Sequence, residues 1–197
     1  MCGIILEKGG VPISFDLHIY IKNPSRFSAA DCEAYLDALG FHGHFDPDFH
    51  PQAFEGCLPF VGTSDLVGDG VVYRIAPEYY LDEYTFEPAP PRKPTLWERL
   101  TGKRPAEAIP EEDPFEGATH SILLSCSYGD SLSILLAYGM AAYAVGGCDG
   151  VLYDPQDDKT YDTPAAVEKA FAICLEDLRK EKEKGRLCLH PDGDETL

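Results

Sequence analysis

The sequence predicts an α+β fold: a single mixed, mostly antiparallel sheet with helices packed mainly on one face. Three observations predict it. Apolar and polar residues alternate over residues 15–22, which is typical of a half-buried strand. Residues 28–40 and 163–185 have helix signals at both ends. The last third has the order strand, helix, strand, helix, which predicts a C-terminal βαβα unit with two parallel strands. We expect the 197 residues to form one domain.

The first forty residues predict two strands and a helix. Residues 4–7 and 15–22 predict a hairpin, since Lys-Gly-Gly between them favours a turn. Ser28 is placed to cap the helix, and Gly40 to end it. One face of the second strand is apolar, as is one stripe of the helix. The strand residues are Phe15, Leu17, Ile19 and Ile21, and the helix residues are Ala30, Ala34, Leu36 and Leu39.

The middle of the chain predicts short strands among loops. Residues 41–62 are rich in Pro, Gly and aromatics, and we expect an ordered loop leading into a short strand. Residues 70–77 and 79–88 predict two strands whose connection is limited by Pro77. Residues 95–102 predict a short helix. Residues 103–117 contain three Pro and four Glu without apolar periodicity, which predicts an exposed loop.

The last third predicts a strand over 118–128, a buried helix capped by Asp130 or Ser131, a strand over 150–154 and a turn over 155–162. The final helix has the clearest ends, because Thr163 can cap it and Pro164 suits its first position. Its packing face should contain the apolar residues at helical spacing. They are Ala166, Val167, Ala170, Phe171, Ile173, Cys174 and Leu178.

The charge of the chain is strongly negative. It contains 34 acidic and 16 basic side chains, so its formal charge is 16 − 34 = −18. Such a surface repels nucleic acids and anionic membranes, and it attracts a basic protein and accelerates the encounter. A plainer interpretation, that acidity only maintains solubility, remains open.

The cysteines and the N-terminus predict a cytoplasmic protein. Seven cysteines are widely spaced without a CxxC pair, which is typical of reduced thiols and excludes a thiolate zinc knuckle. No basic stretch followed by a long apolar run is found near the N-terminus. The longest apolar stretch, LSILLAYGMAAYAVGG, is short for a membrane span.

Three segments have residue types used in catalysis, and each is incomplete. Cys2 in MCGI could be an N-terminal nucleophile, yet the substrate-holding stretches of glutamine amidotransferases do not follow. The SYGDS turn places Ser131 at a helix start without a nameable base. The HGHFDPDFH segment offers metal-ligand types without a fixed motif. Its five candidates are His42, His44, Asp46, Asp48 and His50. No phosphate- or dinucleotide-binding motif is found, so we expect no cofactor.

Acidic and aromatic residues are mixed in three runs, PEYYLDEYTFEP, EEDPFEG and GCDGVLYDPQDDKTYD. Tyrosine gives large rigid contact area, and carboxylates select a cationic partner. The alternative is a solvated strand face with half-buried tyrosines. We expect the first two runs to contact a partner. The predicted contact residues are Tyr79, Tyr80, Asp82, Glu83, Tyr84, Glu111, Glu112 and Asp113.

The last third of the chain resembles a known group of proteins. The helix LLAYGMAAYAVGG followed by GVLYDPQDDKTYDTPAAVEKAF is similar to small bacterial immunity proteins that pair with secreted interbacterial toxins, including those of type VI secretion. The resemblance implies a stoichiometric inhibitor that blocks the toxin's active site or substrate groove, with no catalytic residues. From the charge we add that a nuclease toxin, with a basic groove, would suit this inhibitor.

The predicted function is therefore that of a non-catalytic, acidic binding protein, namely an immunity protein against a basic toxin. It uses no metal or cofactor and contacts neither nucleic acid nor membrane. The alternative is a small metal-dependent or hydrolytic enzyme that uses the His42–His50 segment. A third interpretation is an adaptor within a larger assembly.

Overall fold

The computed structural model describes residues 14–66, 72–86, 113–127 and 130–184. The strands are β1 (Ser14–Ile21), β2 (Phe41–Phe45), β3 (Gly56–Cys57), β4 (Phe60–Ser64), β5 (Val72–Ile75), β6 (Glu78–Glu83), β7 (His120–Ser127), β8 (Gly150–Asp154) and β9 (Lys159–Tyr161). The helices are η1 (Pro24–Arg26), α1 (Ala29–Ala38), α3 (Ser131–Gly147) and α4 (Pro164–Glu183). The predicted α+β class and the C-terminal βαβα unit are confirmed.

The main sheet has six strands in the order β3-β6-β7-β1-β8-β9. Each neighbouring pair is antiparallel. Strands β7 and β8 both run antiparallel to β1, so they are parallel to each other with β1 between them. The strands joined through α3 are thus parallel, as the sequence predicts, although they do not pair directly.

A second sheet of three strands, in the order β2-β4-β5, corrects the expectation of a single sheet. Residues 41–45, predicted as loop, form its strand β2, where Phe41 and Phe45 point into the core. The chain changes sheets between β5 and β6, at Pro77. Proline has no N–H to continue a ladder, and its carbonyl instead accepts a hydrogen bond from the Leu58 N–H (2.8 Å).

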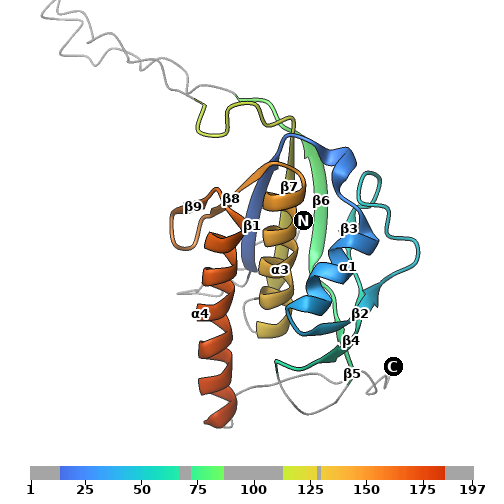
Figure 1. Ribbon diagram of the computed structural model, residues 1–197, viewed down its shortest axis with the longest axis vertical. Coiled ribbons are helices and arrows are strands. Elements are labelled where there is room, and N and C mark those ends of the chain that lie inside the picture. The colour runs from blue at the N-terminus through green and yellow to red at the C-terminus, as the bar shows by residue number, and fades with distance from the viewer. Residues whose placement is uncertain (1–13, 67–71, 87–112, 128–129, 185–197) are drawn as a thin grey trace, which may run out of the picture.

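The helices lie on one side of the main sheet (Figure 1). Helix α3 packs across β1, β7 and β8, and most of its residues are buried. The Phe15 ring of β1 contacts the Tyr138 ring of α3, with centroids 5.8 Å apart. Leu17, Ile19 and Ile21 share the face of Phe15 and are fully buried. Helix α4 lies beside α3 and packs against it (Figure 1).

The predicted helix caps are present. Ser28, Asp130 and Thr163 each accept a hydrogen bond from a backbone N–H of the first helical turn. The predicted packing faces need correction at a few positions. In α1 the buried residues are Cys32 and Leu36, whereas the predicted Ala30 and Ala34 are exposed.

One residue of the packing face predicted for α4, Ile173, does not pack against the core. Ile173 is 57% exposed, because Val167, Ala170, Phe171 and Leu178 already fill the stripe that faces the core. The predicted turn over 155–162 contains the short strand β9. Two predicted elements, the strand over 4–7 and the helix over 95–102, lie outside the described residues, as does most of the 103–117 loop.

No helix in the described part of the chain is long and apolar enough to cross a bilayer. Among the cysteines of the described ranges, Cys32, Cys57, Cys148 and Cys174 form no disulfide bond.

Candidate interaction surface

The face of the main sheet opposite α3 contains most of the described residues that the sequence predicts for partner binding. We call it the open face, because the helices that the structure describes all lie on the other side (Figure 1). Successive side chains of a strand alternate between faces. Since Leu17 and Ile19 face α3, their neighbours His18 and Tyr20 lie on the open face. The strand register adds Tyr80 and Asp82 from β6 and Tyr153 from β8.

Four aromatic rings gather at one end of the open face. The ring of Phe115, from the turn before β7, stacks on Tyr20 with centroids 3.6 Å apart and planes 8° from parallel. Tyr84, just after β6, contacts Tyr20 edge-on at 4.9 Å. Tyr153 of β8 lies 6.3 Å from Phe115. We call Tyr20, Tyr84, Phe115 and Tyr153 the aromatic cluster, and all four side chains are partly exposed.

A carboxylate flanks the aromatic cluster on each of two sides. The Tyr84 hydroxyl donates to Asp113 (2.8 Å), and the Tyr153 hydroxyl donates to Asp158 (3.2 Å). Burial and the Asp113 hydrogen bond raise the pKa of Tyr84 to about 12, and the bond to Asp158 raises the pKa of Tyr153. Both hydroxyls therefore remain protonated donors at neutral pH, and they hold the carboxylates beside the rings.

Neither Asp113 nor Asp158 forms an ion pair with another described residue. The same holds for Asp82, Glu83 and Glu116. The ammonium of Lys22 lies beside Gly117, the residue after Glu116: it would be 3.4 Å from a Cβ at that position. This part of the surface thus combines apolar rings with carboxylates that form no ion pair within the described chain.

The predicted contact residues divide between surface and interior. The prediction of Tyr79 as a contact residue is wrong, because this side chain is fully buried among the rings of Phe27, Phe49 and Phe54. Its hydroxyl donates to the Pro51 carbonyl (2.9 Å). The strand alternation of β6 could have identified it, since Tyr79 shares the inner face with Leu81.

Tyr80 and Asp82 lie on the open face, and Tyr84 and Asp113 are in direct contact there. Glu83 is exposed, but it lies on the face of β6 that is directed toward the helices, where it pairs with His120 of β7. Glu111 and Glu112 lie outside the described residues. Sequence reasoning missed Tyr20, Phe115 and Tyr153 as members of one site. No local pattern joins them, because strand order alone brings these distant positions together.

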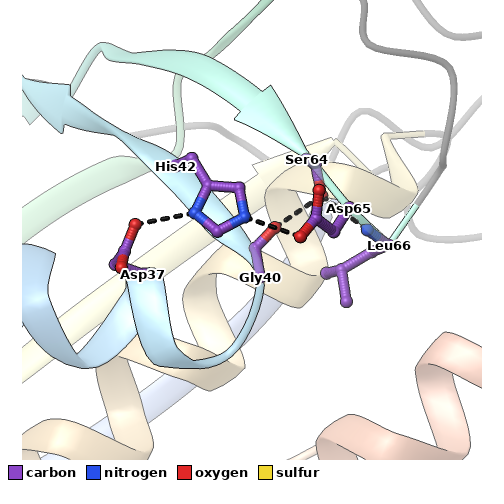
Figure 2. Close-up of polar contacts among 6 residues, drawn as sticks. All are labelled: Asp37, Gly40, His42, Ser64, Asp65 and Leu66. Carbon is purple, nitrogen blue, oxygen red and sulfur yellow. Dashed lines mark hydrogen bonds and ion pairs between the residues drawn. The ribbon is translucent and has the colours of Figure 1, made fainter.

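A second polar cluster joins the end of α1 to the end of β4 (Figure 2). His42 of β2 is held between two carboxylates: its Nδ1 lies 2.6 Å from Asp37 Oδ1 and its Nε2 lies 2.8 Å from Asp65 Oδ2. Hydrogen bonds to Asp37 and then to Asp65 raise the pKa of His42 above its usual value. Beside it, the Ser64 hydroxyl donates to the Gly40 carbonyl (3.2 Å) and accepts from the Leu66 N–H.

This arrangement argues against the metal and hydrolase interpretations of the His42–His50 segment. Both ring nitrogens of His42 are engaged, which leaves none for a substrate proton or a metal. His44 shares the outer face of β2 with His42, while Asp48 and His50 lie exposed in the following loop. Across the described ranges, no three His, Cys, Asp or Glu side chains gather in a group that could hold a metal.

The candidate nucleophile turn SYGDS has a structural role at its helix end. Asp130, not Ser131, caps α3: its carboxylate accepts from the Ser133 N–H (3.1 Å) and contacts the Ser133 hydroxyl. On the open face, Asp16 accepts from the hydroxyls of Ser125 (2.5 Å) and Ser14 (3.4 Å). No hydrogen bond joins His18 to Ser125, so these residues form no nucleophile–base pair. Cys2 lies outside the described residues.

Comparisons with protein-family models, with curated proteins and with solved structures find no match for this chain.

Proposed function

We propose that the protein is a non-catalytic binding protein that neutralises a basic toxin in the cytoplasm, in the manner of an immunity protein. The observation that supports this most is the open face. There Tyr80, Asp82, Tyr84 and Asp113 lie on one surface of a chain whose formal charge is −18. The contact residues are these four together with Tyr20, Phe115 and Tyr153.

The chemistry of the open face fits a stoichiometric protein partner. Binding energy at protein interfaces concentrates in a few partly rigid aromatic and arginine contacts surrounded by polar residues. The stacked and edge-on rings of the aromatic cluster are fixed by one another and by their hydrogen bonds. Little side-chain entropy is then lost when a partner covers them.

The charge favours a partner with a basic groove. A surface of this sign accelerates association with a cationic protein and rejects anionic ones. A nuclease has such a groove, because it holds phosphates. Carboxylates of the open face would occupy the positions of those phosphates, and the bound inhibitor would exclude the substrate from the active site.

Co-expression with the product of the adjacent gene, which we expect to be a basic toxin, tests the proposal. We expect a one-to-one complex, loss of the partner's toxic activity, and an association rate that falls steeply with salt. An adjacent product that is not basic, or that remains fully toxic in the presence of this protein, would contradict it. Salt-independent capture of several unrelated proteins would instead support an adaptor.

A further inference from the structure

The aromatic cluster has features that select among cationic side chains. We infer that it receives an arginine side chain of the partner, whose guanidinium stacks on the exposed ring surface and bonds Asp113 or Asp158. This inference rests on the proposed function, because it names the group by which the basic partner is held.

The ring geometry supports a flat cation. Tyr20 and Phe115 form a nearly parallel stack and both side chains are partly exposed, so a planar group can stack on the exposed part of these rings. Guanidinium stacks on aromatic faces and is weakly hydrated, whereas the ammonium of lysine is a compact, strongly hydrated charge. A planar site therefore favours arginine over lysine.

The carboxylates support the same choice. Asp113 uses Oδ1 to accept from both the Tyr84 hydroxyl and the Phe115 N–H, at 2.8 Å each. The other oxygen of Asp113 has no hydrogen-bond donor among the described residues. Asp158 accepts through Oδ1 from Tyr153 and is exposed. Each carboxylate is oriented by its tyrosine and keeps acceptor capacity for a charge-assisted hydrogen bond.

The test uses single-cation probes, which avoid the general attraction of a polycation to an acidic protein. The peptides acetyl-Gly-Arg-Gly-amide and acetyl-Gly-Lys-Gly-amide are titrated into the full chain while aromatic ring signals are followed by NMR. We expect saturable shifts of the Tyr20 and Phe115 rings. We also expect an affinity for the arginine peptide at least about threefold above that for the lysine peptide.

Two variants locate the binding. Phe115→Leu should bring the ratio of the two affinities close to one. Asp113→Asn with Asp158→Asn should weaken arginine binding about fivefold. Asparagine keeps the Oδ1 acceptor at both positions and suits the left-handed backbone of Asp158 (φ 51°), so this variant preserves the fold. Asp31→Asn with Asp48→Asn removes the same charge at exposed positions elsewhere and should leave binding unchanged.

Equal affinity for the two peptides, or an arginine preference that survives in Phe115→Leu, would overturn the inference. Ring signals that move with protein concentration instead of peptide would mean that a second copy covers the cluster, and would also overturn it. A toxin that binds normally while the arginine peptide does not would reject this inference alone. Peptide binding without any toxin partner would reject the proposed function alone.

Discussion

Tyr138 donates a hydrogen bond from α3 to the carboxylate of Asp154 at the end of β8 (2.5 Å). Asp154 is only 1% exposed, and its other oxygen accepts from the N–H groups of Gln156 and Asp157. Burial and this bond raise the pKa of Tyr138 far above its usual value. The contact fixes the helix against the sheet and orients the turn that leads to Asp158.

Replacing Tyr138 with phenylalanine should therefore destabilise the protein by about 1–3 kcal/mol, because a buried carboxylate oxygen loses its donor. Urea unfolding at neutral pH measures the change. Tyr153→Phe is the matched control: it removes the same hydroxyl from an exposed Tyr–Asp contact, and should change stability by less than about 0.5 kcal/mol. Equal effects of the two substitutions would show that burial of the Tyr138–Asp154 contact contributes nothing.

His42 makes the stability of the fold depend on pH. Asp37 and Asp65 raise its pKa in the folded state above the ordinary value of 6.5. The stabilisation is then fully present below about pH 6.5, and it is lost as the pH rises through the higher pKa of the folded state.

The unfolding midpoints of the wild type and His42→Gln should therefore differ at pH 6 and converge above the folded-state pKa. NMR titration of His42 gives that pKa directly. The control is His44→Gln, an exposed position on the same face of β2. A difference in midpoints that grows with pH, or a His42 pKa at or below 6.5, would rule out the two carboxylates as its cause.

At the scale of the elements, the close approach of β2 and β4 sets the shape of the small sheet. Gly43 and Gly62 face each other across the two strands. A Cβ on Gly62 would stand 2.3 Å from the His42 carbonyl oxygen and 2.5 Å from the Gly43 Cα. Both are backbone atoms, so no side-chain rotation can relieve the clash. Only glycine at both positions permits this contact.

Gly62→Ala should therefore destabilise the protein by about 1–3 kcal/mol or more, as overpacking does. Gly147→Ala is a suitable control, because a Cβ there meets only the Tyr143 ring at ordinary contact distance, 3.5 Å or more. Thermal unfolding of both variants provides the comparison. A neutral Gly62→Ala would mean that β2 and β4 can separate without cost to the fold.

The elements with strong local signals were predictable from the sequence. The period of two in β1 and the caps of α1, α3 and α4 depend on neighbouring residues, and the structure confirms them. Strand β2 differs from the predicted loop, although its buried Phe41 and Phe45 alternate with His42 and His44. The nearby prolines favour a loop, but the strand ends at Phe45, before Pro47. The division into two sheets depends on long-range pairing, which no local pattern encodes.

The candidate surface was predictable only in part, for the same reason. Tyr80, Asp82 and Tyr84 lie within one run, so their composition was visible in the sequence. Tyr20 and Phe115 are far apart along the chain, and they stack only because β1 lies beside β7. Tyr79 shows the limit of composition alone, because the same residue type one position earlier belongs to the core.

At the scale of the whole molecule, charge can act on a partner in a general way and in a local way. The formal charge of −18 attracts any basic protein, whichever face that protein meets. The proposed function requires more, namely that the partner docks on the open face. Asp82 and Glu83 distinguish the two effects, because they are consecutive, both exposed, and on opposite faces of β6.

The most direct measurement is the association rate of the basic toxin with Asp82→Lys and with Glu83→Lys across a salt series. Each substitution changes the formal charge equally, from −18 to −16, so long-range attraction weakens alike in both. We predict that Asp82→Lys slows association and flattens its salt dependence clearly more than Glu83→Lys does. Equal rates for the two variants at every salt concentration would contradict docking on the open face.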